Sequence, residues 1–243
     1  MRFVAAIGLF AMIAAGFLAL RQPTIAAEGA LTTAQKAEVE TIVRDYILAN
    51  PEIIPEAVTI LQQRQRADLI DARRADIETP YESAWAGDAD ADVVLVEFFD
   101  FNCPYCRQSN EDVQRLLRDV DGLKVVWRDF PVLGPASREA AEAAIVAARE
   151  GRYRDFHDGM FADGRRVSSA KTEDLIAEAG LNVGQTKRSM AHSSVDAEID
   201  KNLAMGRALG ITGTPAYVIG DRILDGAVGY DQLKAAVEAA RAS

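Results

Sequence analysis

The most informative part of this chain of 243 residues runs Val93-Val94-Leu95-Val96-Glu97-Phe98-Phe99-Asp100-Phe101-Asn102-Cys103-Pro104-Tyr105-Cys106. Its first seven residues form a nearly continuous apolar run, which predicts a strand in the buried centre of a sheet. Apolar residues then recur at helical spacing from Val113 to Val120, and Gly122 is placed to end that helix. The only two cysteines of the chain therefore fall where a strand leads into a helix.

This position suits cysteines that exchange disulfides with other thiols. The thiolate is the attacking species, so a reactive cysteine needs a lowered pKa. A helix N-terminus supplies this through its dipole and its unpaired backbone N–H groups. Cys103 has this position, with Pro104 at the first helical residue, where a missing N–H costs nothing. We expect Cys103 to attack and Cys106 to resolve, with the dipole and amides lowering the pKa of Cys103 largely unaided.

Two structural roles for the cysteines are less favourable. A disulfide that closes a four-residue ring stabilises little, because the stabilisation grows with loop length. A structural zinc site needs about four ligands, and His157 and His192 lie far downstream. We therefore expect no resident metal and no cofactor beyond the redox-active Cys103–Cys106 pair. Soft thiolates select Cu(I), so a Cu(I) ion on the two sulfurs stays open, although none of the five methionines clusters near them.

The N-terminus predicts export. Residues 3–20 carry no charge, follow Met1-Arg2 and precede the small residues Ala26 and Ala27. We expect a cleavable signal peptide over residues 1–27 and a periplasmic location, where disulfides persist. An uncleaved membrane anchor is the alternative. The net charge of −10 becomes −12 without residues 1–27, which hold two arginines and no acids, and this argues against nucleic acid as a partner.

Residues 28–79 predict an N-terminal helical region. A capping box at Thr32 and Gln35 opens the first helix, and Asn50-Pro51 separates it from a second. The first helix carries an apolar stripe formed by Val39, Ile42, Val43, Tyr46 and Ile47. This region is either an oligomerisation arm that forms a homo-oligomer or a cap packed on its own domain. A long coiled coil is not expected, because Gln65 and Asp68 interrupt the heptad.

Residues 80–243 predict an α/β catalytic domain. A strand–helix–strand unit comes first, then a helical insertion over about 135–210, then a hairpin and a closing helix. We expect strands at 92–99, 123–128, 216–219 and 222–225, and flanking helices at 103–121 and 231–242.

These motifs, in this order, resemble the DsbA-like branch of the thioredoxin superfamily over roughly residues 30–243. The resemblance rests on Glu97 to Cys106, Asp129-Phe130-Pro131, Phe156-His157-Asp158 and Gly213-Thr214-Pro215. Residues 43–61 are similar to the N-terminal region of exported ScsC proteins, the suppressor-of-copper-sensitivity thiol oxidoreductases. Some of these use the region to oligomerise and act as disulfide isomerases, whereas others are monomers.

The resemblance implies a thioredoxin-like fold and a set of site residues. Thr214 and a cis Pro215 would face the cysteines and bind substrate together with Pro104 and Tyr105, and the Thr214 backbone would pair with a substrate strand. Glu97 would be the family's buried acid, which helps to move the proton of Cys106. An acid within an apolar strand is costly unless it is neutral, paired or functional. The alternative for Glu97 is a side chain at a water-filled edge.

The expected function is that of an exported thiol–disulfide oxidoreductase acting on unfolded or misoxidised exported proteins, more an isomerase than an oxidase. Alternatives are a monomeric dithiol oxidase and a periplasmic Cu(I)-binding protein. A membrane thiol–disulfide partner would reduce or reoxidise it. Pro104-Tyr105 is the glutaredoxin pair, not the Pro-His of strongly oxidising DsbA proteins. It predicts a reduction potential between the glutaredoxin range, roughly −200 to −230 mV, and the DsbA value, about −120 mV. We assign no chemical role to His157, His192, Trp85 or Trp127.

Overall fold

The computed structural model describes residues 31–242, and the chain divides into two units, residues 1–54 and residues 55–243. The expected signal peptide lies outside the described residues. Within residues 31–242, no helix combines the length and apolar character needed to cross a membrane.

The described part of the first unit is dominated by α1 (Thr33–Ala49). The predicted capping box is confirmed, because Thr32 Oγ1 accepts from the Gln35 N–H at 3.3 Å and Gln35 Oε1 accepts from the Thr32 N–H at 2.9 Å. No residue of α1 is buried, and Ile42 and Tyr46 on the predicted stripe are each 60% exposed. Asn50 caps the end of α1, and the chain resumes as α2 (Ile53–Asp71).

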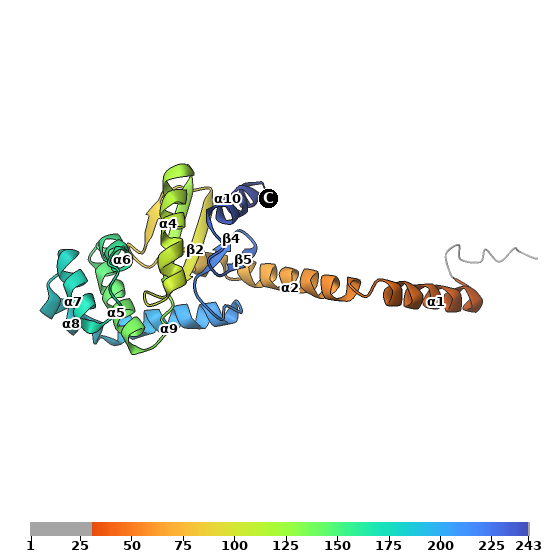
Figure 1. The fold of residues 1–243 in the computed structure, drawn as a ribbon, viewed down its shortest axis with the longest axis horizontal. Coiled ribbons are helices and arrows are strands. Elements are labelled where there is room, and N and C mark those ends of the chain that lie inside the picture. The colour runs from red at the N-terminus through yellow and green to blue at the C-terminus, as the bar shows by residue number, and fades with distance from the viewer. Residues whose placement is uncertain (1–30, 243) are drawn as a thin grey trace, which may run out of the picture. The chain divides into compact units, whose positions relative to one another are not determined.

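The second unit is built on a five-stranded mixed sheet in the order β1-β3-β2-β4-β5. The strands are β1 (Trp85–Gly87), β2 (Val93–Phe99), β3 (Leu123–Asp129), β4 (Ala216–Ile219) and β5 (Arg222–Asp225). Strands β2, β4 and β5 are labelled in Figure 1. β2 and β3 run parallel and every other pair is antiparallel. The predicted α/β architecture is confirmed. The short edge strand β1 was not predicted, because three residues carry no readable periodicity.

Helices cover both faces of the sheet. α4 (Pro104–Asp119) and α10 (Tyr230–Arg241) pack on one face, whereas α3 (Arg74–Glu78) and the end of α2 contribute Ile77 and Ile70 to the cluster on the other. Five helices lie between β3 and β4 in the chain. They are α5 (Pro135–Arg149), α6 (Tyr153–Ala162), α7 (Ser169–Glu178), α8 (Val183–Met190) and α9 (Ser193–Ala208). Figure 1 shows that α5, α6, α7 and α8 group together to one side of the sheet.

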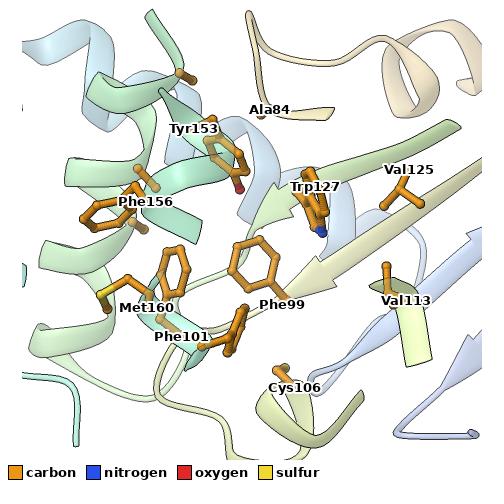
Figure 2. Close-up of a cluster of buried hydrophobic side chains, with 14 of the residues drawn as sticks. Ala84, Phe99, Phe101, Cys106, Val113, Val125, Trp127, Tyr153, Phe156 and Met160 are labelled. Atoms are coloured by element: carbon orange, nitrogen blue, oxygen red, sulfur yellow. The ribbon is translucent and has the colours of Figure 1, made fainter. Parts of the chain in front are cut away.

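The central strand β2 is buried on both faces, as its continuous apolar run predicts. Leu95 and Phe99 join the cluster beneath α4, and Val96 and Phe98 join the cluster on the opposite side. Figure 2 shows the first cluster, which contains aromatic rings from β2, β3 and α6 and has Cys106 at its lower edge.

The residues that the sequence left without chemistry are mostly packing residues. His157 is fully buried with its ring centre 4.5 Å from that of Trp127. Trp127 is a core residue, and Trp85 is half-buried. His192 is exposed and precedes α9.

Candidate active site

The turn between β2 and α4 holds the two cysteines at the end of the sheet. Asp100, which is buried, accepts from the Asn102 N–H at 2.8 Å. Its second oxygen accepts from the N–H groups of Val132 and Leu133 at 2.9 and 3.0 Å. This carboxylate therefore ties the cysteine turn to the loop that follows β3. Cys103 is the N-cap of α4, as its position before Pro104 predicts.

The two thiols are free and differ in character. Cys103 is 4% exposed and Cys106 is fully buried. The pKa of Cys103 is lowered to about 5, mainly because the Cys106 thiol donates a hydrogen bond to its sulfur. The Thr214 side chain and the N–H groups of Cys106 and Tyr105 add to this, while burial opposes it. Burial, with Cys103 and the charge of Glu97 adding to it, raises the pKa of Cys106 far above its ordinary value.

This arrangement gives the pair unequal chemistry. Near neutral pH, Cys103 is a thiolate that can attack a disulfide, whereas Cys106 keeps its proton and can donate it. The expectation that the helix dipole and amides act largely unaided on Cys103 is wrong, because the neighbouring thiol makes the largest contribution. The sequence places that thiol correctly but does not show its orientation.

The Gly213-Thr214-Pro215 segment lies against the cysteines although it is more than a hundred residues away in sequence. The Thr214–Pro215 bond is cis, and the Cys103 Sγ lies 3.3 Å from the Thr214 carbonyl oxygen. Pro104 and Tyr105 are exposed beside Cys103, with Tyr105 at 61%. The structure thus brings together the residues that the sequence assigned to substrate.

Two exposed apolar residues join this end of the sheet without having been predicted. Val132 and Leu133 are 46% and 48% exposed, and their N–H groups are held by Asp100. Their sequence signal is weak, since two apolar residues after Phe130-Pro131 are equally compatible with a buried turn.

Glu97 lies in the protein interior. Its side chain accepts from Trp127 Nε1 at 3.1 Å and from the Tyr217 hydroxyl at 3.3 Å, and the residue is 2% exposed. The alternative of a water-filled edge is therefore wrong. Burial raises the pKa of Glu97 to about 8, against the effect of its two hydrogen bonds.

The partners of Glu97 come from both neighbouring strands. Glu97 pairs in register with Trp127 of β3 and with Tyr217 of β4. The Tyr217 hydroxyl also lies 2.6 Å from Ser109 Oγ on α4, one turn after Cys106. Sequence reasoning missed Tyr217 and Ser109, because their meeting depends on the register of β4 and on the rotation of α4.

The described residues, 31–242, contain no group of three or more His, Cys, Asp or Glu side chains arranged to hold a metal ion. The ligand set available at the site is the two sulfurs of Cys103 and Cys106.

A helix-capping thiolate beside a buried thiol, next to a cis proline at the same end of a mixed sheet, is the site of a thiol–disulfide oxidoreductase. Comparison with known proteins agrees: residues 94–238 match the family model described as a DSBA-like thioredoxin domain. Residues 35–68 match the model described as the copper resistance protein ScsC N-terminal domain. The chain belongs to the DsbA-like thioredoxin family and is a thiol–disulfide oxidoreductase of the DsbA/ScsC type.

Solved structures share the fold over most of the chain. A linker-deletion variant of ScsC from Proteus mirabilis is 31% identical, covers 89% of this chain and 99% of its own, and has a TM-score of 0.69. The thiol–disulfide exchange protein alpha-DsbA2 from Wolbachia pipientis is 25% identical, with 74% and 97% covered and a TM-score of 0.67. The predicted thioredoxin-like fold with an N-terminal helical region is confirmed.

Curated relatives include disulfide bond formation protein D from Bacillus subtilis, 25% identical over 63% of this chain and 74% of that protein. A Na(+)/H(+) antiporter NhaA from Salinispora tropica is 30% identical over 65% of this chain, but the match spans only 24% of the antiporter. The likeness to the antiporter is thus confined to about a quarter of its length. DsbA-like enzymes use a redox-active disulfide without an external cofactor and act with substrate proteins and membrane partners.

Proposed function

We propose that this protein is an exported disulfide isomerase that acts on misoxidised proteins as a homo-oligomer. The observation that carries the proposal is the placement of the two sulfurs: Cys103 caps α4 beside the exposed Pro104 and Tyr105, whereas Cys106 is fully buried. The lowered pKa of Cys103 and the raised pKa of Cys106 agree with this placement. An attacking thiolate whose resolving partner holds its proton forms mixed disulfides readily and resolves them slowly.

The chemistry needs no net oxidant. The Cys103 thiolate attacks a substrate disulfide, forming a Cys103–substrate disulfide and releasing one substrate thiolate. A different substrate thiolate then attacks the Cys103–substrate bond, which closes a new substrate disulfide and returns the Cys103 thiolate. If Cys106 attacks first, the substrate leaves reduced and the enzyme is oxidised, so a membrane thiol–disulfide partner must reduce it again.

Substrate contact is assigned to the exposed end of the sheet. The Thr214 backbone before cis Pro215 would pair with an extended substrate strand, as unpaired strand edges do. Pro104 and Tyr105 would contact the same segment from the other side of Cys103. The exposure of Tyr105 and the 3.3 Å approach of Cys103 to Thr214 support this assignment.

The oligomer would form through residues 28–79. The apolar stripe on α1 is exposed in a single chain, and a second copy of the same helix offers a matching surface. The match of residues 35–68 to the ScsC N-terminal domain supports the same region. Residues 1–27 would act as a cleavable signal peptide that directs export to the periplasm.

The test is refolding of scrambled, fully oxidised ribonuclease by the reduced mature protein, with the mass of the same sample measured by light scattering. Recovered ribonuclease activity from an oligomer supports the proposal. A variant of α1, Ile42→Asp with Tyr46→Asp, tests the role of the stripe. It should be monomeric and lose isomerase activity, but it should still exchange disulfides. If no ribonuclease activity is recovered and a monomer rapidly oxidises reduced ribonuclease, the protein is a dithiol oxidase.

A Cu(I)-binding role is the second candidate, because the two sulfurs converge and the N-terminal match is to a copper resistance protein domain. Titration of the reduced protein with Cu(I) separates the functions. A copper carrier binds one ion tightly and exchanges disulfides poorly, whereas an isomerase does the reverse.

A further inference from the structure

Two buried hydroxyl groups form a hydrogen-bond chain with Glu97 and have no role in the chemistry described above. Tyr217 is fully buried and Ser109 is 1% exposed. The Tyr217 hydroxyl lies 3.3 Å from Glu97 Oε1 and 2.6 Å from Ser109 Oγ. Ser109 follows Cys106 by one helical turn, and Tyr217 follows Pro215 by two residues. The hydroxyl pair therefore joins the two segments that frame the site.

The two sides of the Glu97 carboxyl group have different partners. Trp127 Nε1 is a donor only and meets one oxygen at 3.1 Å. The other oxygen meets a hydroxyl that can donate or accept. When Glu97 is ionised, Ser109 can donate to Tyr217, and Tyr217 can donate to Glu97. When Glu97 is protonated, the same chain can run from Glu97 to Tyr217 and on to Ser109.

We propose that Tyr217 and Ser109 are positioning residues for Glu97, whose hydrogen-bond chain reverses direction as Glu97 takes up and returns the proton of Cys106. Either charge state of the buried carboxyl then has a hydrogen-bond partner on both oxygens, which avoids the cost of an unsatisfied buried group. The inference rests on the proposed thiol–disulfide exchange and assigns it two further residues.

The proton has a defined place in the exchange. Cys106 loses its proton to Glu97 and its sulfur attacks Cys103 Sγ, which forms the Cys103–Cys106 disulfide. The bond from Cys103 to the departing thiol breaks, and that thiol leaves as a thiolate. The hydroxyl hydrogens of Tyr217 and Ser109 only change their direction, so the step needs no further oxidant or base.

The titratable groups around Glu97 come from four elements. Cys103, the N-cap of α4, and Cys106 of α4 interact with its charge, as does Tyr153 of α6. Tyr217 of β4 is hydrogen bonded to it. Further from Glu97, Asp129 of β3 accepts a hydrogen bond from the Tyr153 hydroxyl, and the ring of His157 of α6 contacts that of Trp127 in a tilted arrangement. α10 contributes the apolar side chains Leu233, Ala236 and Val237 to this cluster.

The test follows the resolving step directly in the full chain. Reduced protein is mixed with oxidised glutathione, quenched with acid at successive times, and analysed by mass spectrometry from pH 5 to 10. The mixed disulfide of Cys103 with glutathione decays as Cys106 attacks. A plot of the decay rate against pH has a midpoint at the apparent pKa of the Cys106–Glu97 pair, which shares one proton in this step. Tyr217→Phe should raise this midpoint by about one pH unit, because an ionised Glu97 loses a donor.

Ser109→Ala should move the midpoint the other way. It leaves the Tyr217 hydroxyl with Glu97 as its one remaining acceptor, which favours the ionised carboxyl. In a Glu97→Gln background, Tyr217→Phe should leave the pH profile unchanged. Tyr153→Phe, which removes another buried hydroxyl, is the matched control and should keep the wild-type midpoint.

The inference is overturned if Tyr217→Phe behaves like Tyr153→Phe, or if its shift persists in the Glu97→Gln background. It is also overturned if Ser109→Ala raises the midpoint. A wild-type protein that forms no mixed disulfide at Cys103 would instead contradict the proposed function, and the two failures are therefore distinguishable.

Discussion

Glu97→Gln should unfold with a higher free energy than wild type, and this difference should grow as the pH rises. The pKa of Glu97 is raised from 4.5 to about 8 by burial. Below pH 4.5 the carboxyl is protonated in both the folded and unfolded chains, so burial carries no ionisation penalty. Between pH 4.5 and 8 the unfolded chain ionises while the folded chain stays protonated, and the stability present at low pH is lost.

The size of the effect follows from the shift. One pKa unit corresponds to 1.36 kcal/mol, so a shift from 4.5 to about 8 corresponds to about 5 kcal/mol of stability lost by pH 8. Asp129, which burial also raises to a pKa of about 8, is present in both proteins and cancels in the difference. Glutamine fits the site, because its carbonyl can accept from Trp127 and its amide can donate to Tyr217, which then donates to Ser109.

The assay is urea unfolding of wild type and Glu97→Gln at pH 4.5 to 8.5, with both thiols kept reduced. The difference between their free energies of unfolding should grow by several kcal/mol across this range in favour of the variant and then level off. A difference that stays constant within about 1 kcal/mol would mean that Glu97 ionises normally in the folded state, and it would refute the reasoning.

Three further outcomes are expected. Cys106→Ala removes the main donor to the Cys103 sulfur and should raise the pKa of Cys103 by about one to two units, measured from thiolate absorbance against pH. Arg128→Met leaves three main-chain carbonyls at the end of α3 without their buried donor, and should lower the unfolding free energy by about 3–5 kcal/mol in urea. Gly206→Ala places a Cβ 2.4 Å from a Phe130 ring atom and should cost about 1–3 kcal/mol, read as a lower Tm; an unchanged Tm would contradict this packing.

The elements next to the cysteines were predictable because their signals are local. The apolar run of β2 and the helical spacing of α4 put their boundaries within two residues of those observed. The same holds for the hairpin of β4 and β5, which the turn at Gly220-Asp221 defines. The edge strand β1 depends on pairing with β3, so its three residues carry no signal of their own.

The polar interior of the site was not predictable beyond Glu97. An acid in an apolar strand indicates that a partner exists, but Tyr217 and Ser109 are 120 and 12 residues away in sequence. Their meeting depends on the register of β4 and on the rotation of α4, which sequence patterns do not specify. The donor role of Cys106 toward Cys103 depends on a side-chain orientation in the same way.

The pKa of Cys103 also sets an expected redox potential. Thioredoxin, with an attacking cysteine of pKa about 7, has a potential of about −270 mV. Lowering that pKa to about 5 stabilises the reduced form at pH 7 by about 2.3 kcal/mol more, which corresponds to about 50 mV. The expected value is therefore about −220 mV, at the glutaredoxin end of the window that Pro104-Tyr105 predicts.

Equilibration with glutathione buffers measures this potential. A value below that of thioredoxin would contradict the lowered pKa of Cys103, and a value near −120 mV would require a stabilisation of the thiolate that the contacts of Cys103 do not supply. At about −220 mV the pair is a weaker oxidant than DsbA, for which the value is about −120 mV. In the oxidising compartment proposed for this protein, such a pair stays partly reduced only if a partner returns electrons to it. An isomerase needs this supply, because each attack by Cys106 consumes the Cys103 thiolate.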